Sequence, residues 1–132
     1  MMSLTKDRTF RPRMIFAYVD SEHAARCGRY FRRLGWEVHL VASAEEARRL
    51  AAASGVDVIV LDVDLPDESG WLTCAKMTRE NPTLPIILLA PDRSPETVRH
   101  LADVNAAALI SRHDTLDVLA GTILCHRLAE TV

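Results

Sequence analysis

The sequence holds few of the residues that build disulfide-rich, zinc-binding or fibrous proteins. Its 132 residues include five glycines and six prolines, too few for a collagen-like or low-complexity chain. Cys27, Cys74 and Cys125 are odd in number, lie far apart and include no CxxC pair. The sequence therefore predicts neither a disulfide framework nor a zinc ribbon, and this use of cysteine suits the reducing cytoplasm.

Long apolar runs and an excess of charge of one sign are also missing. No apolar run approaches the roughly 20 residues needed to cross a bilayer. The run from Met14 to Val19 ends at Asp20, too early for a secretory signal. Sixteen Lys and Arg residues stand against eighteen Asp and Glu residues, for a formal charge of −2. We therefore expect a soluble cytoplasmic protein whose overall charge directs it to neither nucleic acid nor membrane.

Two further kinds of site lack their sequence patterns. The glycines form neither a GxGxxG nor a Walker loop, which argues against a nucleotide-binding enzyme. The five histidines show no HExxH or other metal-ligand spacing, so a zinc site is not predicted. They are His23, His39, His100, His113 and His126. Only His113 is predicted to lie where functional residues gather, just after the last predicted strand.

The length and composition indicate one domain with a full hydrophobic core. Single domains cluster at about 100 to 150 residues, and hydrophobic residues make up 48% of this chain. We predict a flexible, basic N-terminal tail over residues 1–13 and a single domain over residues 14–130. The tail carries Lys6, Arg8, Arg11 and Arg13 against Asp7. It either contacts an acidic partner or is a solvated leader without a role.

Five short apolar runs predict five strands. Several are almost continuously apolar, which is typical of strands buried on both faces and so of a parallel sheet. The runs are Met14–Val19, Trp36–Ala42, Val56–Leu61, Pro85–Ala90 and Ala107–Ser111. Because a parallel sheet requires helices on both faces, helices are expected between the runs.

The intervening segments have the pattern and the end signals of helices. They are Ser21 to Leu34, Ser43 through Leu50 with a stop at Gly55, Gly70 to Glu80, a helix from Ser94-Pro95, and one from Asp114 to about Ala129. The predicted N-caps are Ser21, Ser43, Ser94 and Asp114. Arg26, Arg29 and Arg33 share one face of the first helix, which is typical of a solvated face.

Strand and helix alternate five times, which predicts an α/β fold: a doubly wound, five-stranded parallel sheet with helices on both faces. In such sheets the functional residues lie just after the carboxyl ends of the strands. Asp20 and Asp62 follow the first and third runs, whose strands we expect to be neighbours. Two carboxylates close together raise each other's pKa unless a cation lies between them. The pair therefore indicates a divalent metal or a functionally poised acid.

The residues around Asp62 resemble the receiver domain of bacterial response regulators, which has this flavodoxin-like fold. The likeness covers about residues 14–128 and includes the spacing Asp62-x-x-x-Pro66-x-x-x-Gly70. It implies a protein of two-component signalling. In such a protein Asp62 would be the phospho-acceptor, receiving a phosphoryl group from a histidine kinase or a phosphotransfer protein.

The resemblance also implies a Mg²⁺ site, and here the sequence departs from the family pattern. The family's ligands are two adjacent acids, the acceptor and a backbone carbonyl, which correspond here to Asp20 with Ser21, to Asp62 and to Asp64. Ser21 is not an acid, so one carboxylate is missing and any Mg²⁺ site is expected to be weak or absent. Asp64 and Asp92 add carboxylates on the rim, which either replace the missing ligand or repel a phosphoryl group. We expect repulsion.

Four further residues differ from what the resemblance implies for a working switch. Ala90 stands where the family has Thr or Ser, and Leu109 where it often has an aromatic residue. Arg112-His113 replaces Lys-Pro, and a planar guanidinium is not equivalent to an ammonium. Without proline a cis bond costs about 2.5 to 4 kcal/mol, so we predict a trans Arg112–His113 bond and a redirected side chain.

Three functions stay open at this point. We favour an atypical receiver that acts mainly by protein–protein contacts, through the face of its fourth helix, fifth strand and fifth helix, which also suits a homodimer. The alternative is a phosphorylation-competent single-domain receiver, in which Arg112 replaces the lysine and Ser21 tolerates Mg²⁺. The third is an enzyme that uses Asp20, Asp62 and His113 for metal-assisted hydrolysis. Because a second ligand cluster is missing, we expect no enzyme.

No output domain is expected after the last predicted helix. The chain is then either a single-domain regulator or a piece of a longer protein.

Overall fold

Five strands and five helices alternate along the part of the chain that the computed structural model describes, residues 11–53 and 55–131. The strands are β1 (Arg13–Ala17), β2 (Glu37–Val41), β3 (Val58–Asp62), β4 (Ile86–Ala90) and β5 (Ala108–Ser111). The helices are α2 (Ser21–Arg33), α3 (Ala44–Ala53), α4 (Gly70–Glu80), α5 (Pro95–Val104) and α6 (Leu116–Thr131). All strands pair in parallel in the order β2-β1-β3-β4-β5, which confirms the predicted α/β fold. None of these helices combines the length and apolar character needed to cross a membrane.

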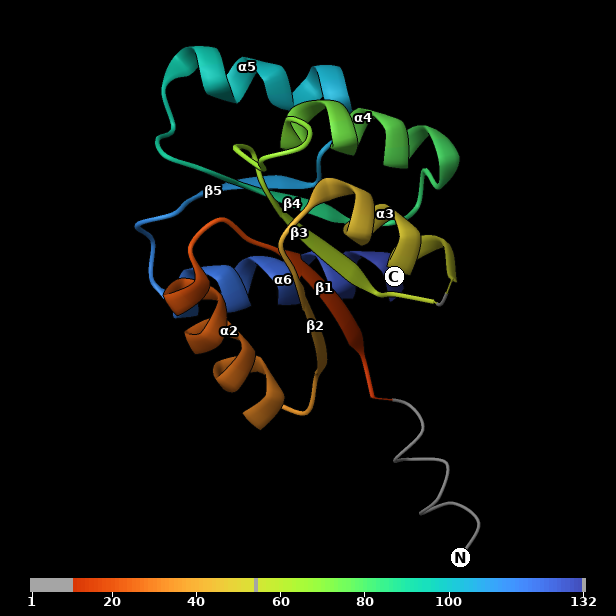
Figure 1. Cartoon of the computed structure of the whole chain (residues 1–132), viewed down its shortest axis with the longest axis vertical. Coiled ribbons are helices and arrows are strands. Elements are labelled where there is room, and N and C mark those ends of the chain that lie inside the picture. Colours follow the sequence, from red (N-terminus) through yellow and green to blue (C-terminus); the bar gives the residue numbers. More distant parts are fainter. Residues whose placement is uncertain (1–10, 54, 132) are drawn as a thin grey trace, which may run out of the picture.

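The helices cover both faces of the sheet (Figure 1). α3, α4 and α5 pack on one face, and α2 and α6 pack on the other. Side chains alternate along each strand, so Ile59 and Leu61 of β3 point to the first layer and Val58 and Val60 to the second. Both central strands, β3 and β4, are buried along their whole length. This burial explains why their sequences are continuously apolar instead of alternating.

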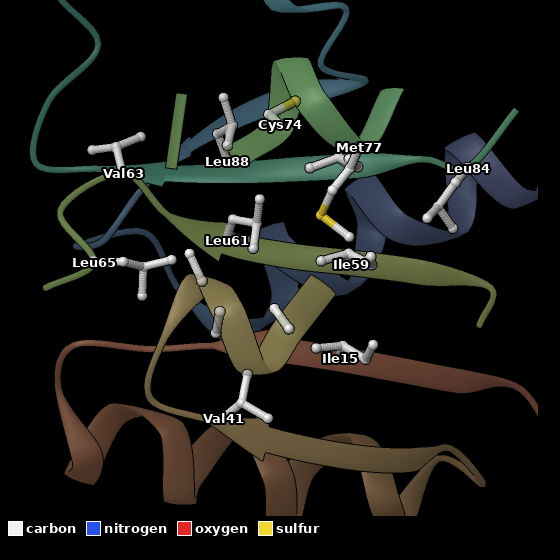
Figure 2. Packing of buried hydrophobic residues seen from close by; sticks show 14 of the residues in the cluster. Ile15, Val41, Ile59, Leu61, Val63, Leu65, Cys74, Met77, Leu84 and Leu88 are labelled. Atoms are coloured by element: carbon white, nitrogen blue, oxygen red, sulfur yellow. The ribbon is translucent and has the colours of Figure 1, made fainter. Parts of the chain in front are cut away.

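The layer beneath α3 and α4 is shown in Figure 2. Ile15, Ile59 and Leu88, from three neighbouring strands, belong to one buried cluster with Cys74 and Met77 of α4. Burial raises the pKa of the Cys74 thiol to about 12, so the thiol stays protonated at neutral pH and packs as a small apolar group.

The first strand begins one residue earlier than predicted. Arg13, a tail residue in the sequence-based prediction, is the first residue of β1 and pairs in register with Glu37. Its backbone N–H donates to the carboxylate of Asp57 at 2.8 Å, and its side chain lies 3.4 Å from that of Glu37. Both partners are distant in sequence, and no local pattern indicates them. Residues 1–10 of the predicted tail lie outside the described residues.

The N-cap of α2 is Asp20, not the predicted Ser21. The Asp20 carboxylate accepts hydrogen bonds from the backbone N–H groups of Glu22 at 3.0 Å and His23 at 3.2 Å. A carboxylate one residue earlier reaches these first-turn amides and is favoured by the positive end of the helix dipole. Ser21 becomes the first helical residue.

The last helix also begins differently, and the predicted Asp114 cap is wrong. The Asp114 carboxylate turns back to the N–H of Ser111 at 3.1 Å, while its own N–H donates to the Ser111 carbonyl at 3.0 Å. Aspartate closes such turns as readily as it caps helices, and a sequence pattern does not separate the two roles. α6 begins two residues later, at Leu116.

The predicted caps of α3 and α5 are confirmed. The Ser43 hydroxyl accepts a hydrogen bond from the N–H of Glu46 at 3.1 Å, and the Ser94 hydroxyl accepts one from Thr97 at 3.2 Å. Each donor lies three residues from its acceptor, so these caps could be predicted from local sequence. α4 has the predicted bounds.

A second acceptor at the start of α3 comes from a distant residue. The Asp67 carboxylate, in the loop between β3 and α4, accepts hydrogen bonds from the N–H groups of Ala44 at 2.8 Å and Glu45 at 3.0 Å. These amides hold the pKa of Asp67 below its usual value. The loop that follows Asp62 is thereby fastened to the neighbouring helix.

Asp67→Ala is expected to lower the free energy of unfolding by about 1 kcal/mol at neutral pH, because α3 loses one of its caps. The folded pKa of Asp67 is lowered, so its contribution is present above the unfolded value of 3.8 and is lost as pH falls through the folded value. Urea unfolding across the acidic range should therefore show a gap between wild type and variant that narrows as pH falls. Asp103→Ala, which removes an exposed carboxylate from α5, is the control. A gap that is constant with pH would contradict the role of Asp67.

Candidate functional site

The structure brings Asp20, Asp62 and Arg112 together at the edge of the sheet where β1, β3 and β5 end. Asp62 is the last residue of β3, and only 3% of its surface is exposed. Asp20 stands between β1 and α2, and Arg112 directly follows β5. A pocket of about 190 Å³ is lined by these three residues and by His23 and His113.

The Arg112 side chain covers both oxygens of the Asp62 carboxylate. Its Nε donates to Oδ2 at 2.7 Å, and its Nη2 donates to Oδ1 at 2.6 Å. This paired geometry is the strongest common arrangement between a guanidinium and a carboxylate. The backbone N–H of Asp64 also donates to Oδ1, at 2.9 Å. Three hydrogen bonds from the chain itself therefore hold the buried carboxylate, two at Oδ1 and one at Oδ2.

Asp64 binds the same guanidinium from the solvent side. Nη2 of Arg112 lies 2.5 Å from Oδ2 of Asp64, whose side chain is exposed. Hydrogen bonding to Asp62 raises the pKa of Arg112, partial burial opposes the shift, and hydrogen bonding to Asp64 adds to it. We refer to Arg112 with Asp62 and Asp64 as the Arg112 clamp. Within it the charge of Asp64 is paired, whereas the sequence suggested a free acid on the rim.

Ala90 and Leu109 occupy the strands next to the clamp. Ala90 ends β4, the strand between those that lead to Asp62 and Arg112, and its carbonyl accepts the N–H of Arg112 at 2.8 Å. Its buried side chain is a methyl group without a hydroxyl. Leu109 is buried in β5 opposite Leu88. Neither residue offers a polar or aromatic group that could respond to charge at Asp62.

The side chains implied as Mg²⁺ ligands have other partners. Asp20 caps α2, Asp62 is held by Arg112, and Ser21 is exposed on the first turn of α2. In the described ranges, no three His, Cys, Asp or Glu side chains are grouped so that they could hold a metal ion. Mg²⁺ prefers about six oxygen ligands in near-octahedral geometry. A Mg²⁺ ion here would therefore have to take Asp62 from Arg112 and compete with the first amides of α2 for Asp20.

The described residues contain no cis peptide bond, so the predicted trans bond between Arg112 and His113 is confirmed. The N–H of His113 donates to the Ser111 hydroxyl at 3.1 Å, and its exposed ring lines the pocket.

Asp92, the other predicted rim acid, does not line the pocket. Its carboxylate accepts the N–H of Ser94 at 2.9 Å, which lowers the pKa of Asp92 and fixes it at the start of α5.

His23 also lines this pocket, so the prediction that His113 is the only histidine at this edge is wrong. The half-buried His23 ring meets Phe16 edge to face, with 5.9 Å between centroids, and Nε2 lies 3.6 Å from Sγ of Cys27. Burial, with a smaller effect from Arg26, holds the pKa of His23 below its usual value. The available signal was its spacing, four residues before Cys27 on the inner face of α2.

The packing around Gly70 explains why the spacing that begins at Asp62 ends in a glycine. Its N–H donates to the Val63 carbonyl at 3.0 Å. A Cβ at this position would lie 2.8 Å from Cα of Val63 and would overlap the backbone oxygen of Asp62. The start of α4 thus packs directly on the backbone of the buried acid, and only glycine leaves room for this approach.

A doubly wound parallel sheet with a buried acid at the end of β3 and a cation directly after β5 defines a receiver-type signalling module. The chain belongs to the response regulator receiver domain family, whose model matches residues 19–123. It is therefore a domain of two-component signalling.

Individual relatives agree with this assignment. The TorCAD operon transcriptional regulatory protein TorR of Escherichia coli is 40% identical over 65 residues, which cover 49% of this chain and 28% of TorR. TcrX of Mycobacterium tuberculosis, a probable transcriptional regulatory protein, is 42% identical over 55 residues, which cover 42% of this chain and 24% of TcrX. A CheY-like receiver domain of Methanospirillum hungatei shares the fold, with a TM-score of 0.82 at 20% identity over 91% of this chain and 97% of that one. The chain thus spans well under half the length of the curated relatives.

Proposed function

We propose that this receiver domain is atypical and acts mainly through protein–protein contacts in a phosphorelay, with weak or absent phosphorylation of Asp62. The observation that carries the proposal is the Arg112 clamp, which engages both oxygens of Asp62. Phosphoryl transfer needs one of these oxygens to bond to phosphorus while the bond from phosphorus to the donor nitrogen breaks. With Arg112 in place, each oxygen already accepts a charge-assisted hydrogen bond, which lowers its reactivity as a nucleophile, and the guanidinium has to move before phosphorus can approach.

The charge balance supports the same proposal. One guanidinium faces the two carboxylates of Asp62 and Asp64, so the clamp already carries an excess of negative charge. An incoming phosphoryl group adds further negative charge beside these two carboxylates. A stable acyl phosphate is therefore disfavoured at this site within the described part of the chain.

The path from Asp62 to a partner surface is also changed. The resemblance implies a switch in which a hydroxyl and an aromatic ring move. In this chain Ala90 and Leu109 stand at those two positions and supply neither group. The face of α5, β5 and α6 carries exposed Val98 and Val118, and we propose it as a contact surface that is the same in every state of Asp62. Its partner is a histidine kinase, a phosphotransfer protein, another signalling protein or a second copy of the chain.

The alternative is a receiver that accepts a phosphoryl group on Asp62 with Mg²⁺. It is supported by the retained acid and by the pocket beside it, which Arg112 and Arg26 line with positive charge. In this alternative Arg112 would release one oxygen of Asp62 and act as the lysine does in the family. The two functions differ in whether the clamp opens.

Titration with beryllofluoride and Mg²⁺ distinguishes them, because this complex binds an aspartate carboxylate as a phosphoryl mimic. We expect no saturable change in backbone amide chemical shifts or in the fluorescence of Trp71, the residue after Gly70. Arg112→Lys is expected to bind the mimic measurably, since an ammonium leaves one carboxylate oxygen free. Asp62→Asn is the matched control, with nearly the same shape and no nucleophile.

A saturable response of the wild-type chain at physiological Mg²⁺ that Asp62→Asn abolishes would overturn the proposal and establish the alternative. A response that persists in Asp62→Asn would come from another site and leave Asp62 unmodified, as proposed.

A further inference from the structure

A hollow between α3 and α4, on one face of the sheet, consists of two adjoining parts. The larger part has a volume of about 470 Å³ and is lined mainly by charged residues of α3, of the loop after β3 and of the end of α4. The smaller part has a volume of about 280 Å³ and has the buried Met77 and Leu84 in its wall (Figure 2). Arg48, Ala52 and Glu80 line both parts. We call the whole hollow the α3–α4 pocket, and its size suits a small organic molecule.

Arg48 lies where the two parts meet, and its Nε has no acceptor in the described part of the chain. This nitrogen is buried, and Arg48 forms no salt bridge there. Two acids of the pocket are already used by other groups. The Asp67 carboxylate accepts the first amides of α3, and the Glu68 carboxylate binds Thr73 and Lys76. A buried donor of a charged group is costly to leave without an acceptor, so the position of Arg48 favours a ligand that brings one.

Glu80 supplies the opposite charge at the same junction. It is the last residue of α4 and is exposed, and within the described ranges no salt bridge joins it to Arg48 or to any other residue. Arg48 belongs to α3, so the two helices that form the walls present one cation and one anion to the same space. Glu45 and Arg49 line the larger part and add one further charge of each sign.

This arrangement restricts the charge of a ligand. A carboxylate can accept two parallel hydrogen bonds from a guanidinium, and it would give Nε of Arg48 its acceptor. A ligand with only a carboxylate would place a second negative charge near Glu80, and a ligand with only an amine would leave Arg48 without an acceptor. A zwitterion satisfies both groups. An apolar side chain on that zwitterion then suits the smaller part, because Met77 and Leu84 lie in its wall.

We propose that the α3–α4 pocket binds a free α-amino acid with an apolar side chain. Arg48 binds the carboxylate, Glu80 binds the ammonium group, and the side chain packs on Met77 and Leu84. None of the three residues of the Arg112 clamp lines this pocket. The inference therefore goes beyond the proposed function and does not depend on whether Asp62 accepts a phosphoryl group.

Titration of the full chain with L-leucine, followed by backbone amide chemical shifts, tests the proposal. We expect saturable shifts at the amides of Arg48, Ala51 and Met77, and a Tm that rises with leucine concentration. Three comparison ligands each lack one part of leucine. 4-Methylpentanoate lacks the amine, 3-methylbutylamine lacks the carboxylate, and glycine lacks the apolar side chain. Each is expected to bind about tenfold or more weakly than leucine.

Two substitutions remove the charges of the site. Arg48→Gln and Glu80→Gln are each expected to weaken leucine binding by about tenfold or more. Arg79→Gln, at an exposed arginine of α4 that lines neither part, is the matched control and should bind like wild type. Because Nε of Arg48 has no acceptor in the described chain, Arg48→Gln is expected to keep the Tm of the ligand-free protein.

Equal binding of leucine and of either singly charged analogue, or unchanged affinity in Arg48→Gln, would overturn the proposal. So would leucine-dependent shifts confined to residues outside the α3–α4 pocket, or the absence of any saturable shift. A lower Tm of ligand-free Arg48→Gln would also overturn it, since Arg48 would then have a stabilising partner within the chain. None of these results involves beryllofluoride or Asp62, so failure here is distinct from failure of the proposed function.

Discussion

Arg112→Ala is expected to lower the free energy of unfolding by roughly 2 to 4 kcal/mol. Asp62 would keep its buried charge and lose the cation that binds both of its oxygens. Removing one partner of a buried pair costs more than the pair itself contributes, because the remaining charge is left without compensation. The Arg112 side chain is 25% exposed, so water that replaces it moderates the loss and sets the lower end of the range.

Urea unfolding measures this loss, and a double-mutant cycle separates charge from packing. Asp62→Asn removes the charge at nearly constant shape, so Arg112→Ala is expected to cost much less in that background. Asp64→Ala removes the exposed partner of Arg112 and should change stability by less than about 0.5 kcal/mol. Equal losses in both backgrounds would show that Arg112 stabilises the fold by packing and not through the clamp.

Gly70→Ala is expected to lower the free energy of unfolding by about 2 to 3 kcal/mol. The added Cβ would lie 2.8 Å from Cα of Val63 and 3.0 Å from the backbone carbon of Asp62, and it would overlap the Asp62 oxygen. Backbone atoms cannot rotate away as the end of a flexible side chain can. α4 or the end of β3 must therefore shift, and the Asp62 amide should show a large chemical-shift change.

Gly121→Ala is the matched control, since both substitutions add one methyl group to a helical glycine. Open space surrounds Gly121, so the alanine is expected to stabilise the chain by about 0.5 to 1 kcal/mol through helix propensity. A Gly70→Ala variant that is as stable as Gly121→Ala would contradict the close approach of α4 to Asp62.

Both expected results concern Asp62. Gly70 fixes the backbone of Asp62, and Arg112 fixes its side chain. A carboxylate held in this way is suited to one constant arrangement of the edge of the sheet. This is why we propose that the domain signals through a contact surface, the face of α5, β5 and α6.

Most of the fold could be predicted from local sequence. The apolar runs of β3 and β4 indicate strands buried on both faces, because a parallel sheet covered by helices leaves no polar side. Ser43 and Ser94 indicate helix starts, because a capping side chain binds an amide only three residues away. The spacing from Asp62 to Gly70 could also be recognised in the sequence, because both residues belong to one continuous strand-loop-helix unit.

The sequence by itself thus determined the fold class, the order of its elements, and the identity of the acid and the cation at the edge of the sheet. Only the tertiary structure decided that Arg112 engages both oxygens of an acid 50 residues away, that Asp67 caps α3, and that His23 lines the pocket. Helix and strand patterns arise from neighbours within a few residues, whereas these contacts depend on where the sheet places distant side chains. The pairing that keeps Asp62 occupied is therefore a property of the folded molecule and has no local signal in the chain.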